Sequence, residues 1–215
     1  MILSFRERIR IGWAVVGAFA VMAVGATTAY GESPPAPDAN GTYQAPAGVQ
    51  QSQYAINLLD PYVVRLRDGT LALNAPASVS SKVDAATMKQ VRSGMTVVNG
   101  EIRAGRLVAT ANHRVIDPTS TDLNIQDGWT GLRWYWWGVV IYLSEFYTQK
   151  FMAALAIGAS LFALCAAIPA LANQVACGIL AALFALLGAI IWFVDNGRGV
   201  YFVHHWWGSD WVYAQ

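Results

Sequence analysis

Cys165 and Cys177 are the only cysteines of the chain, and each stands six residues from Leu171. If the chain folds back near Leu171 as two antiparallel helices, the two sulfur atoms face each other. Facing thiols in an exported protein are candidates for a disulfide bond. The alternative is a pair of free cysteines that pack as small apolar side chains.

The histidines and the isolated acidic residues do not form a catalytic or metal-binding pattern. His204 and His205 are neighbours in a segment that we expect to be a strand, where adjacent side chains point to opposite faces and cannot bind one metal ion. A role in pH sensing is the weaker alternative. His113 has no cysteine or carboxylate at ligand spacing, and single acids in turns are found at Asp127, Asp195 and Asp210. We therefore predict no catalytic, cofactor-binding or metal site, and we do not expect an enzyme.

Most of the apolar character lies in one long segment. The chain has 215 residues, of which 55% are hydrophobic and 13% are charged, whereas ordinary soluble domains carry about 25% charged residues. No residue from Phe151 to Val194 is charged. About 20 apolar residues cross the hydrocarbon core of a bilayer, so this segment is long enough for two helices, predicted at 151–172 and 175–194. The net charge of +1 lacks the basic excess that nucleic acids require, so no nucleic-acid partner is expected.

The bend between these two predicted helices is uncharged. Pro169 and the amide pair of Asn173 and Gln174 form its tip, and the charged residues that flank the segment lie at the opposite end. Carrying a charge through hydrocarbon costs at least about 2.5 kcal/mol, so a neutral tip favours insertion of a hairpin, residues 145–194, into a membrane. Small residues let two helices approach closely. We assign this packing role to Ala154, Gly158, Ala181, Ala185 and Ala189.

Aromatic and β-branched residues on both sides of the hairpin predict strands. We expect strands at 134–143, 199–207 and 211–215, which form one short aromatic sheet at the base of the hairpin. Aromatic belts mark the water interface of membrane proteins. We therefore expect interfacial positions for Trp134, Trp136, Trp137, Trp192, Trp206, Trp207 and Trp211.

The beginning of the chain predicts export. Residues 1–31 combine three arginines, an apolar run at 11–26 and small residues before position 32, which is the pattern of a signal peptide. An uncleaved membrane anchor is the alternative. Residues 32–57 are rich in Pro, Ala and Gln and are expected to form a linker. Either way, the rest of the chain is predicted to leave the cytoplasm and to be secreted or membrane-associated.

The middle of the chain predicts a small structured unit at 58–104. Asp68-Gly69 between alternating apolar residues predicts a β-hairpin, and an amphipathic helix, with Ser80 or Ser81 as its cap, follows to about residue 103. A second linker is expected at 105–126, before the aromatic sheet and hairpin at 127–215. These segments predict a mainly α fold with a small β component: a signal helix, an amphipathic helix, and a hydrophobic helical hairpin on a three-stranded sheet.

The C-terminal block combines a Trp-rich segment at 134–137, a helix start at Leu143-Ser144-Glu145, the Ala- and Gly-rich hairpin and a return at 196–201. From about residue 130 to 215 it resembles uncharacterised secreted actinobacterial proteins with a Trp-flanked helical hairpin. The resemblance implies secretion and no particular activity. In architecture alone, the uncharged hairpin is similar to the buried hairpin of pore-forming colicins, which are bacteriocins.

Three hypotheses about function follow from the sequence. The first is an exported, membrane-active protein, bacteriocin-like or pore-forming, whose hairpin inserts into a lipid bilayer. Its partners are the bilayer and, as further options, copies of itself as a homo-oligomer or an immunity or carrier protein. The second is an integral membrane protein with a structural or accessory role. The third is a soluble secreted binding domain with the hairpin as its core.

Overall fold

The computed structural model describes residues 44–112, 114–118, 123–125 and 128–215, all of which belong to one unit that spans Pro35–Gln215. The predicted signal segment, residues 32–43 of the first predicted linker, His113 and Asp127 lie outside the described residues.

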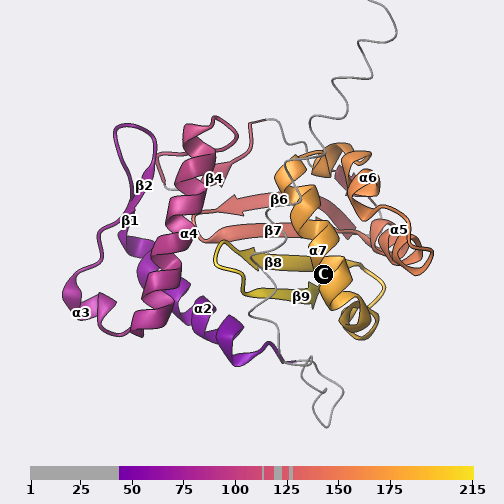
Figure 1. Ribbon diagram of the computed structural model, residues 1–215, viewed down its shortest axis with the longest axis horizontal. Coiled ribbons are helices and arrows are strands. Elements are labelled where there is room, and N and C mark those ends of the chain that lie inside the picture. Colours follow the sequence, from indigo (N-terminus) through magenta and orange to yellow (C-terminus); the bar gives the residue numbers. More distant parts are fainter. Residues whose placement is uncertain (1–43, 113, 119–122, 126–127) are drawn as a thin grey trace, which may run out of the picture. The chain divides into compact units, whose positions relative to one another are not determined.

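An antiparallel sheet forms the centre of the described fold (Figure 1). Its strands lie in the order β3 (Val108–Ala109), β4 (Val115–Ile116), β6 (Gly128–Tyr135), β7 (Gly138–Leu143), β8 (Val200–His205) and β9 (Asp210–Ala214), and β5 (Leu123–Ile125) also pairs with β6. The prediction of a mainly α fold with a three-stranded sheet is therefore wrong. Strands β3, β4 and β5 lie in the predicted linker 105–126, because strands of two or three residues are too short to give a periodic pattern.

The predicted single strand at 134–143 is a hairpin of β6 and β7. Trp136 and Trp137 form its turn, and the sequence does not reveal the turn because Trp-Trp lacks the Asn and Gly that usually mark one. Gly138 then opens β7 against β8. A side chain at this position would collide with the backbone carbonyl of His204, so glycine is needed for the two strands to pair. The predicted strands 199–207 and 211–215 are confirmed as β8 and β9.

Between β7 and β8 the chain forms a layer of helices, α5 (Glu145–Ala156), α6 (Leu161–Ala166), the 3-10 helix η3 (Pro169–Leu171) and α7 (Gln174–Val194). The predicted first helix at 151–172 is wrong, because it is broken after α5. Gly158 adopts a positive φ of 67° there, and Ser160 begins α6 by accepting a hydrogen bond from the Ala163 amide at 3.2 Å. Pro169 opens η3 beyond the end of α6, as expected of a residue that cannot continue a helix.

The second predicted helix, at 175–194, is confirmed as α7. Asn173 caps it, because its Oδ1 accepts hydrogen bonds from the amides of Val175 (2.9 Å) and Ala176 (3.2 Å). The inner side of α7 packs on the sheet through Phe184, whose ring centre lies 4.9 Å from that of Phe151 and 5.2 Å from that of Phe202. In the part of the chain that the structure describes, α7 is the one helix long and apolar enough to cross a membrane, with 21 residues and a mean hydropathy of 2.6.

The elements that precede the sheet in the chain pack against one end of it. This end carries the Trp-rich turns between β6 and β7 and between β8 and β9 (Figure 1). They are α2 (Ala47–Leu59), the 3-10 helix η2 (Asp60–Tyr62), β1 (Val63–Arg65), β2 (Leu71–Leu73), α3 (Ala77–Ser80) and α4 (Ala85–Arg103). The predicted β-hairpin and amphipathic helix are confirmed as β1–β2 and α4. The cap of α4 is Asp84 rather than a serine, since its Oδ1 accepts from the Thr87 amide at 2.9 Å. The first predicted linker is wrong from Ala47 onward, where α2 begins.

Candidate functional site

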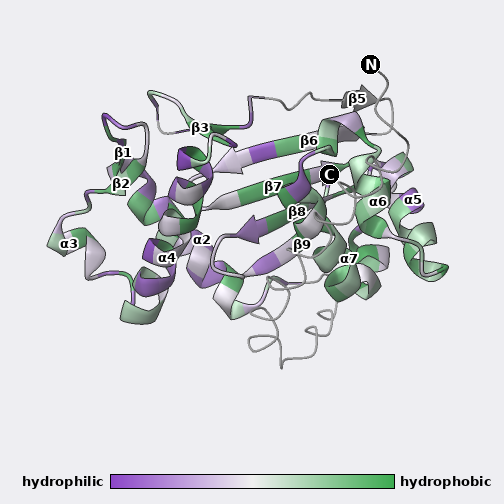
Figure 2. Cartoon of the chain, turned by 45° about the horizontal axis from the view of Figure 1, so that its top comes forward, coloured by the Kyte–Doolittle hydropathy of each residue, from purple (hydrophilic) through white to green (hydrophobic). Residues whose placement is uncertain are grey.

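Six of the eleven large apolar side chains that are exposed among the described residues lie on the helical layer. No residue of this layer between Phe151 and Val194 is charged, and Figure 2 shows it as almost continuously hydrophobic. Its large exposed side chains are Ile157 (81% exposed), Trp192 and Phe193 (both 66%), Leu186 (40%) and Phe162 (39%), and Phe146 (46%) lies at the start of α5. We call these six residues and the small residues between them the apolar face. Contiguous exposed apolar surface marks a contact site for a membrane or a partner.

The small residues that we assigned to helix packing belong mostly to this face. Gly158, Ala185 and Ala189 are exposed, and Ala154 and Ala181 are half-buried. The close contact between α5 and α7 is instead made at Gly188, where an added Cβ would lie 2.9 Å from Cδ2 of Leu155. Ala181, Ala185 and Ala189 do repeat every four residues, but they lie toward the outer side of α7.

Six of the seven predicted interfacial tryptophans are buried or half-buried. Trp134, Trp136 and Trp211 are buried, Trp137, Trp206 and Trp207 are half-buried, and Trp192 is exposed. The indole Nε1 atoms of Trp136 and Trp207 donate to Asp60 (2.7 Å) and Ser52 (3.0 Å), so these rings join the sheet to α2 and η2. Of the seven, only Trp192 faces outward on the helical layer. Trp134 and Trp211 lie in β6 and β9, and the other four lie in turns that the preceding helices cover.

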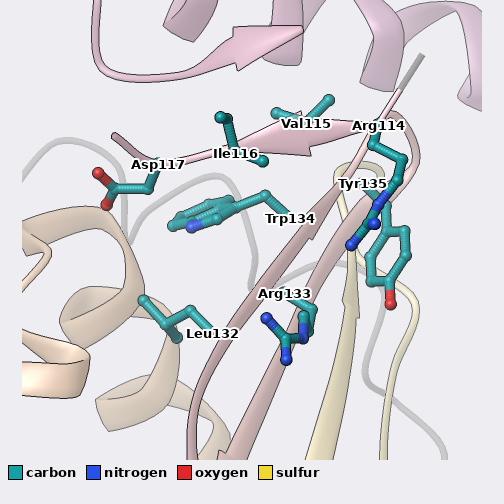
Figure 3. A pocket seen from close by; sticks show the side chains of 8 residues that line it. All are labelled: Arg114, Val115, Ile116, Asp117, Leu132, Arg133, Trp134 and Tyr135. Atoms are coloured by element: carbon teal, nitrogen blue, oxygen red, sulfur yellow. The ribbon is translucent and has the colours of Figure 1, made fainter. Parts of the chain in front are cut away.

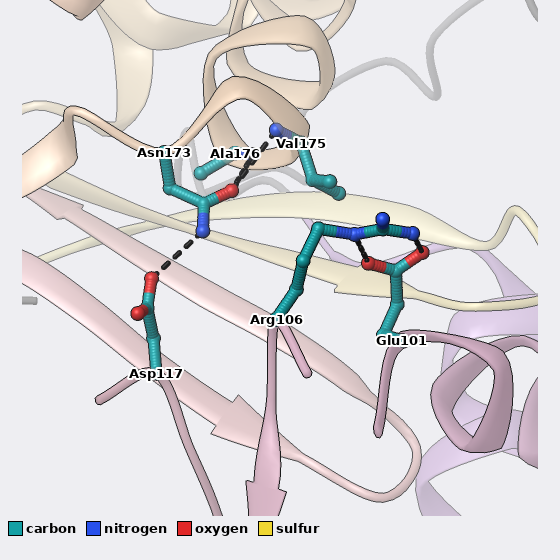
Figure 4. A network of polar contacts seen from close by, with 6 residues as sticks. All are labelled: Glu101, Arg106, Asp117, Asn173, Val175 and Ala176. Atoms are coloured by element: carbon teal, nitrogen blue, oxygen red, sulfur yellow. Dashed lines mark hydrogen bonds and ion pairs between the residues drawn. The ribbon is translucent and has the colours of Figure 1, made fainter. Parts of the chain in front are cut away.

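The predicted tip of the hairpin is tied to the sheet (Figure 4). The side-chain amide of Asn173 donates to Oδ2 of Asp117, which lies just after β4 and is 6% exposed. Gln174 is exposed, as is Pro169. The tip therefore contains no charge of its own but is held by a buried carboxylate 56 residues earlier in the chain.

The two cysteines are close enough for a disulfide bond, and the structure joins Cys165 in α6 to Cys177 in the first turn of α7. Their Cα atoms lie 5.4 Å apart, and both residues are buried. The carbonyl oxygen of Leu171 lies 3.6 Å from one sulfur and 3.2 Å from the other. The bond thus cross-links the two sides of the bend between α6 and α7 within the buried interior.

At the other end of the layer, two carboxylates lie at the start of α5 and just after the end of α7. Asp195 follows α7, and its Oδ1 accepts from the amides of Gly197 (3.0 Å) and Gly199 (3.2 Å). Glu145 begins α5, and its Oε1 accepts from the side chain of Gln149 at 2.7 Å. Burial raises the pKa of Glu145 most and the neighbouring Asp195 raises it further, while the amides of Gln149 and Gly199 act in the opposite direction.

The two neighbouring histidines point to different surroundings, as expected on a strand. Nδ1 of His204 lies 2.6 Å from Oδ1 of Asp210. His205 is buried between the rings of Trp137 and Trp207, with Nδ1 close to the Ser209 carbonyl, and burial lowers its pKa. Among the described residues there is no group of three or more His, Cys, Asp or Glu side chains that could hold a metal ion.

A small pocket of about 60 Å³ lies beside β4 and β6 (Figure 3). It is lined by Arg114, Val115, Ile116, Asp117, Leu132, Arg133, Trp134 and Tyr135. Ligand pockets usually measure about 300–1,000 Å³, so this one has room for water rather than for a substrate.

Searches against protein families, curated proteins and solved structures find no match for this chain. The resemblance to secreted actinobacterial proteins therefore stays a prediction. Among the residues of the candidate site, the sequence did not point to Phe146, Ile157, Leu186, Phe193 and Asp117. The uncharged run signals Ile157, Leu186 and Phe193 only as a group, because it does not tell which side of each helix is exposed, and Phe146 lies outside the run.

Proposed function

We propose that this protein is exported and acts on membranes, binding lipid bilayers through the apolar face of α5, α6 and α7. The observation that carries the proposal is the exposure of large apolar side chains on a layer that has no charged residue from Phe151 to Val194. Exposed apolar side chains lose free energy when they leave water, about 1.5–3 kcal/mol for each large one that becomes fully buried. Because this surface has no charged group that must lose its water, no desolvation cost offsets that gain.

The contacts of the layer favour binding parallel to the membrane surface over insertion of a hairpin from its tip. α7 packs on the sheet along its inner side through Phe184, and Asn173 at its start is bonded to Asp117. Insertion from the tip breaks both contacts, whereas surface binding needs neither to change. Aromatic residues at one end of the face, Trp192 and Phe193, suit the interface between lipid tails and headgroups.

The test is flotation of the exported protein with vesicles of uncharged phosphatidylcholine. We expect the protein to float with the vesicles, and we expect the double substitution Trp192→Ser and Phe193→Ser to weaken binding by about tenfold or more, since two large apolar side chains are removed. The matched control is Tyr54→Ser, which removes an exposed aromatic ring (55% exposed) from α2. Equal binding by the double variant and the native protein, or no flotation of the native protein, rejects the proposal.

Release of a trapped dye from the same vesicles separates the two modes of membrane action. Surface binding leaves the dye inside, whereas a pore-forming or bacteriocin-like action releases it. If the protein does not bind vesicles but forms oligomers in solution through the same residues, the apolar face is instead a contact between copies of the chain.

A further inference from the structure

Glu145 and Asp195 stand where α5 begins and α7 ends, next to the most aromatic part of the apolar face. Phe146 follows Glu145 directly, and Trp192 and Phe193 lie three and two residues before Asp195. All three aromatic side chains are exposed. Any bilayer that receives these rings therefore approaches the two carboxyl groups as well.

The surroundings of Glu145 favour a proton on its carboxyl group. Oε2 of Glu145 is buried and makes no hydrogen bond. The amide of Gly199 donates to Oδ1 of Asp195, and the burial of Glu145 and the carboxylate of Asp195 both raise the pKa of Glu145. A residue other than glycine at position 199 would collide with the backbone of Ser144 and Glu145, so the two ends are packed tightly. A proton on Glu145 turns its buried carboxyl group into a hydrogen-bond donor and removes its repulsion by Asp195.

The other charged groups of these elements do not neutralise the pair. Lys150 on α5 is exposed, with Nζ 4.1 Å from the ring centre of Phe146, and Arg198 in the turn after α7 is exposed. α7 itself contributes no charged residue, and the neighbouring strands β7, β8 and β9 bring the neutral phenols of Tyr142, Tyr201 and Tyr213.

We propose that Glu145 makes bilayer binding by the apolar face acid-sensitive: uptake of a proton by its carboxylate removes a negative charge beside Phe146, Trp192 and Phe193 and strengthens binding. This inference rests on the proposed membrane function. A charge next to the interface opposes the transfer of its neighbours out of water, and the carboxylate is the form that opposes it. Glu145 thus weakens binding at neutral pH and permits it in acid.

The experiment measures flotation of the exported protein with phosphatidylcholine vesicles between pH 4.5 and 8. Uncharged lipid removes the general attraction between an acid-protonated protein and an anionic surface. We expect binding to increase about fivefold as the pH falls, which corresponds to about 1 kcal/mol of binding free energy. Glu145→Gln should bind at pH 8 as the native protein binds in acid, with most of the pH dependence lost.

The matched control is Glu101→Gln, which removes the same charge from the end of α4, where Glu101 pairs with Arg106 at 2.5 Å (Figure 4). It should retain the native pH dependence. Binding of the native protein that does not change with pH, or equal effects of Glu145→Gln and Glu101→Gln, overturns the inference while the membrane function stands. Absence of binding at every pH overturns both, and circular dichroism of each variant shows that it is folded.

Discussion

The side-chain amide of Asn173 donates a hydrogen bond to the buried carboxylate of Asp117, with 2.7 Å between Nδ2 and Oδ2. The same asparagine caps α7 through its Oδ1. One side chain therefore caps the long apolar helix α7 and joins it to the end of β4. This contact makes the neutral tip of the helical segment a fixed part of the fold.

Replacing Asn173 should destabilise the protein through both of its roles. Asn173→Ala removes a helix cap, which costs about 1 kcal/mol, and a hydrogen bond to a charged group, which contributes about 1.5–3 kcal/mol. We expect a loss of about 2–4 kcal/mol in the free energy of unfolding, measured by urea denaturation. Gln174→Ala, at the exposed next position, is the control and should change stability by less than about 0.5 kcal/mol. Equal effects of the two substitutions would show that the contact with Asp117 is not important.

The Cys165–Cys177 bond should stabilise the fold through a short loop. The two residues are 12 positions apart, and closing a loop of about this length contributes roughly 3 kcal/mol. We expect dithiothreitol to lower the denaturation midpoint of the native protein and to leave that of the double variant Cys165→Ala and Cys177→Ala unchanged. Mass spectrometry without reductant checks the bond directly, and two alkylated thiols in the exported protein would contradict it.

His205 should make the fold less stable in acid. Burial lowers its pKa in the folded state below the value of about 6.5 that it has when unfolded. The unfolded chain therefore binds this proton first, so the contribution of His205 is fully present above pH 6.5 and is lost as the pH falls below that value. His205→Asn, which keeps a donor for the Ser209 carbonyl, should flatten this part of the stability profile. A His205 ring that titrates at or above pH 6.5 in NMR spectra would refute the prediction.

Two glycines of α7 should respond differently to the same substitution. Around Gly178 there is no atom within 4 Å of an added Cβ, so Gly178→Ala should stabilise the helix by up to about 1 kcal/mol. Gly188→Ala should gain less, because the new methyl group meets Leu155 at 2.9 Å and forces it to move. Thermal denaturation of the two variants compares them. A larger gain at position 188 would mean that α5 and α7 do not pack closely there.

Several elements of the fold can be predicted from local sequence patterns. The hairpin of β1 and β2 follows from Asp68-Gly69, and α7 follows from an uncharged apolar run that begins after the capping residue Asn173. The strands β8 and β9 follow from their aromatic and β-branched residues. These features depend on neighbours within a few residues, so the sequence is sufficient to predict them.

The sheet and the site depend on contacts between distant residues. The uncharged run looks like two equal helices, but Gly158 and Ser160 break the first, and a pattern of small apolar residues does not show where such a break falls. The sequence suggests interfacial tryptophans, but in the structure α2 and α4 cover the turns that carry Trp206 and Trp207. Burial depends on what packs above a side chain and not on its type.

The sequence by itself determined that residues 151–194 carry no charge, that Cys165 and Cys177 are candidates for a disulfide bond, and that one apolar segment is long enough to cross a membrane. Only the tertiary structure decided which side of the helical layer is exposed and that Asp117 holds its tip. The physical reason is that apolar composition determines how much free energy side chains gain when they are removed from water. The packing of the sheet against one side of α7 determines which of these side chains are buried and which remain exposed.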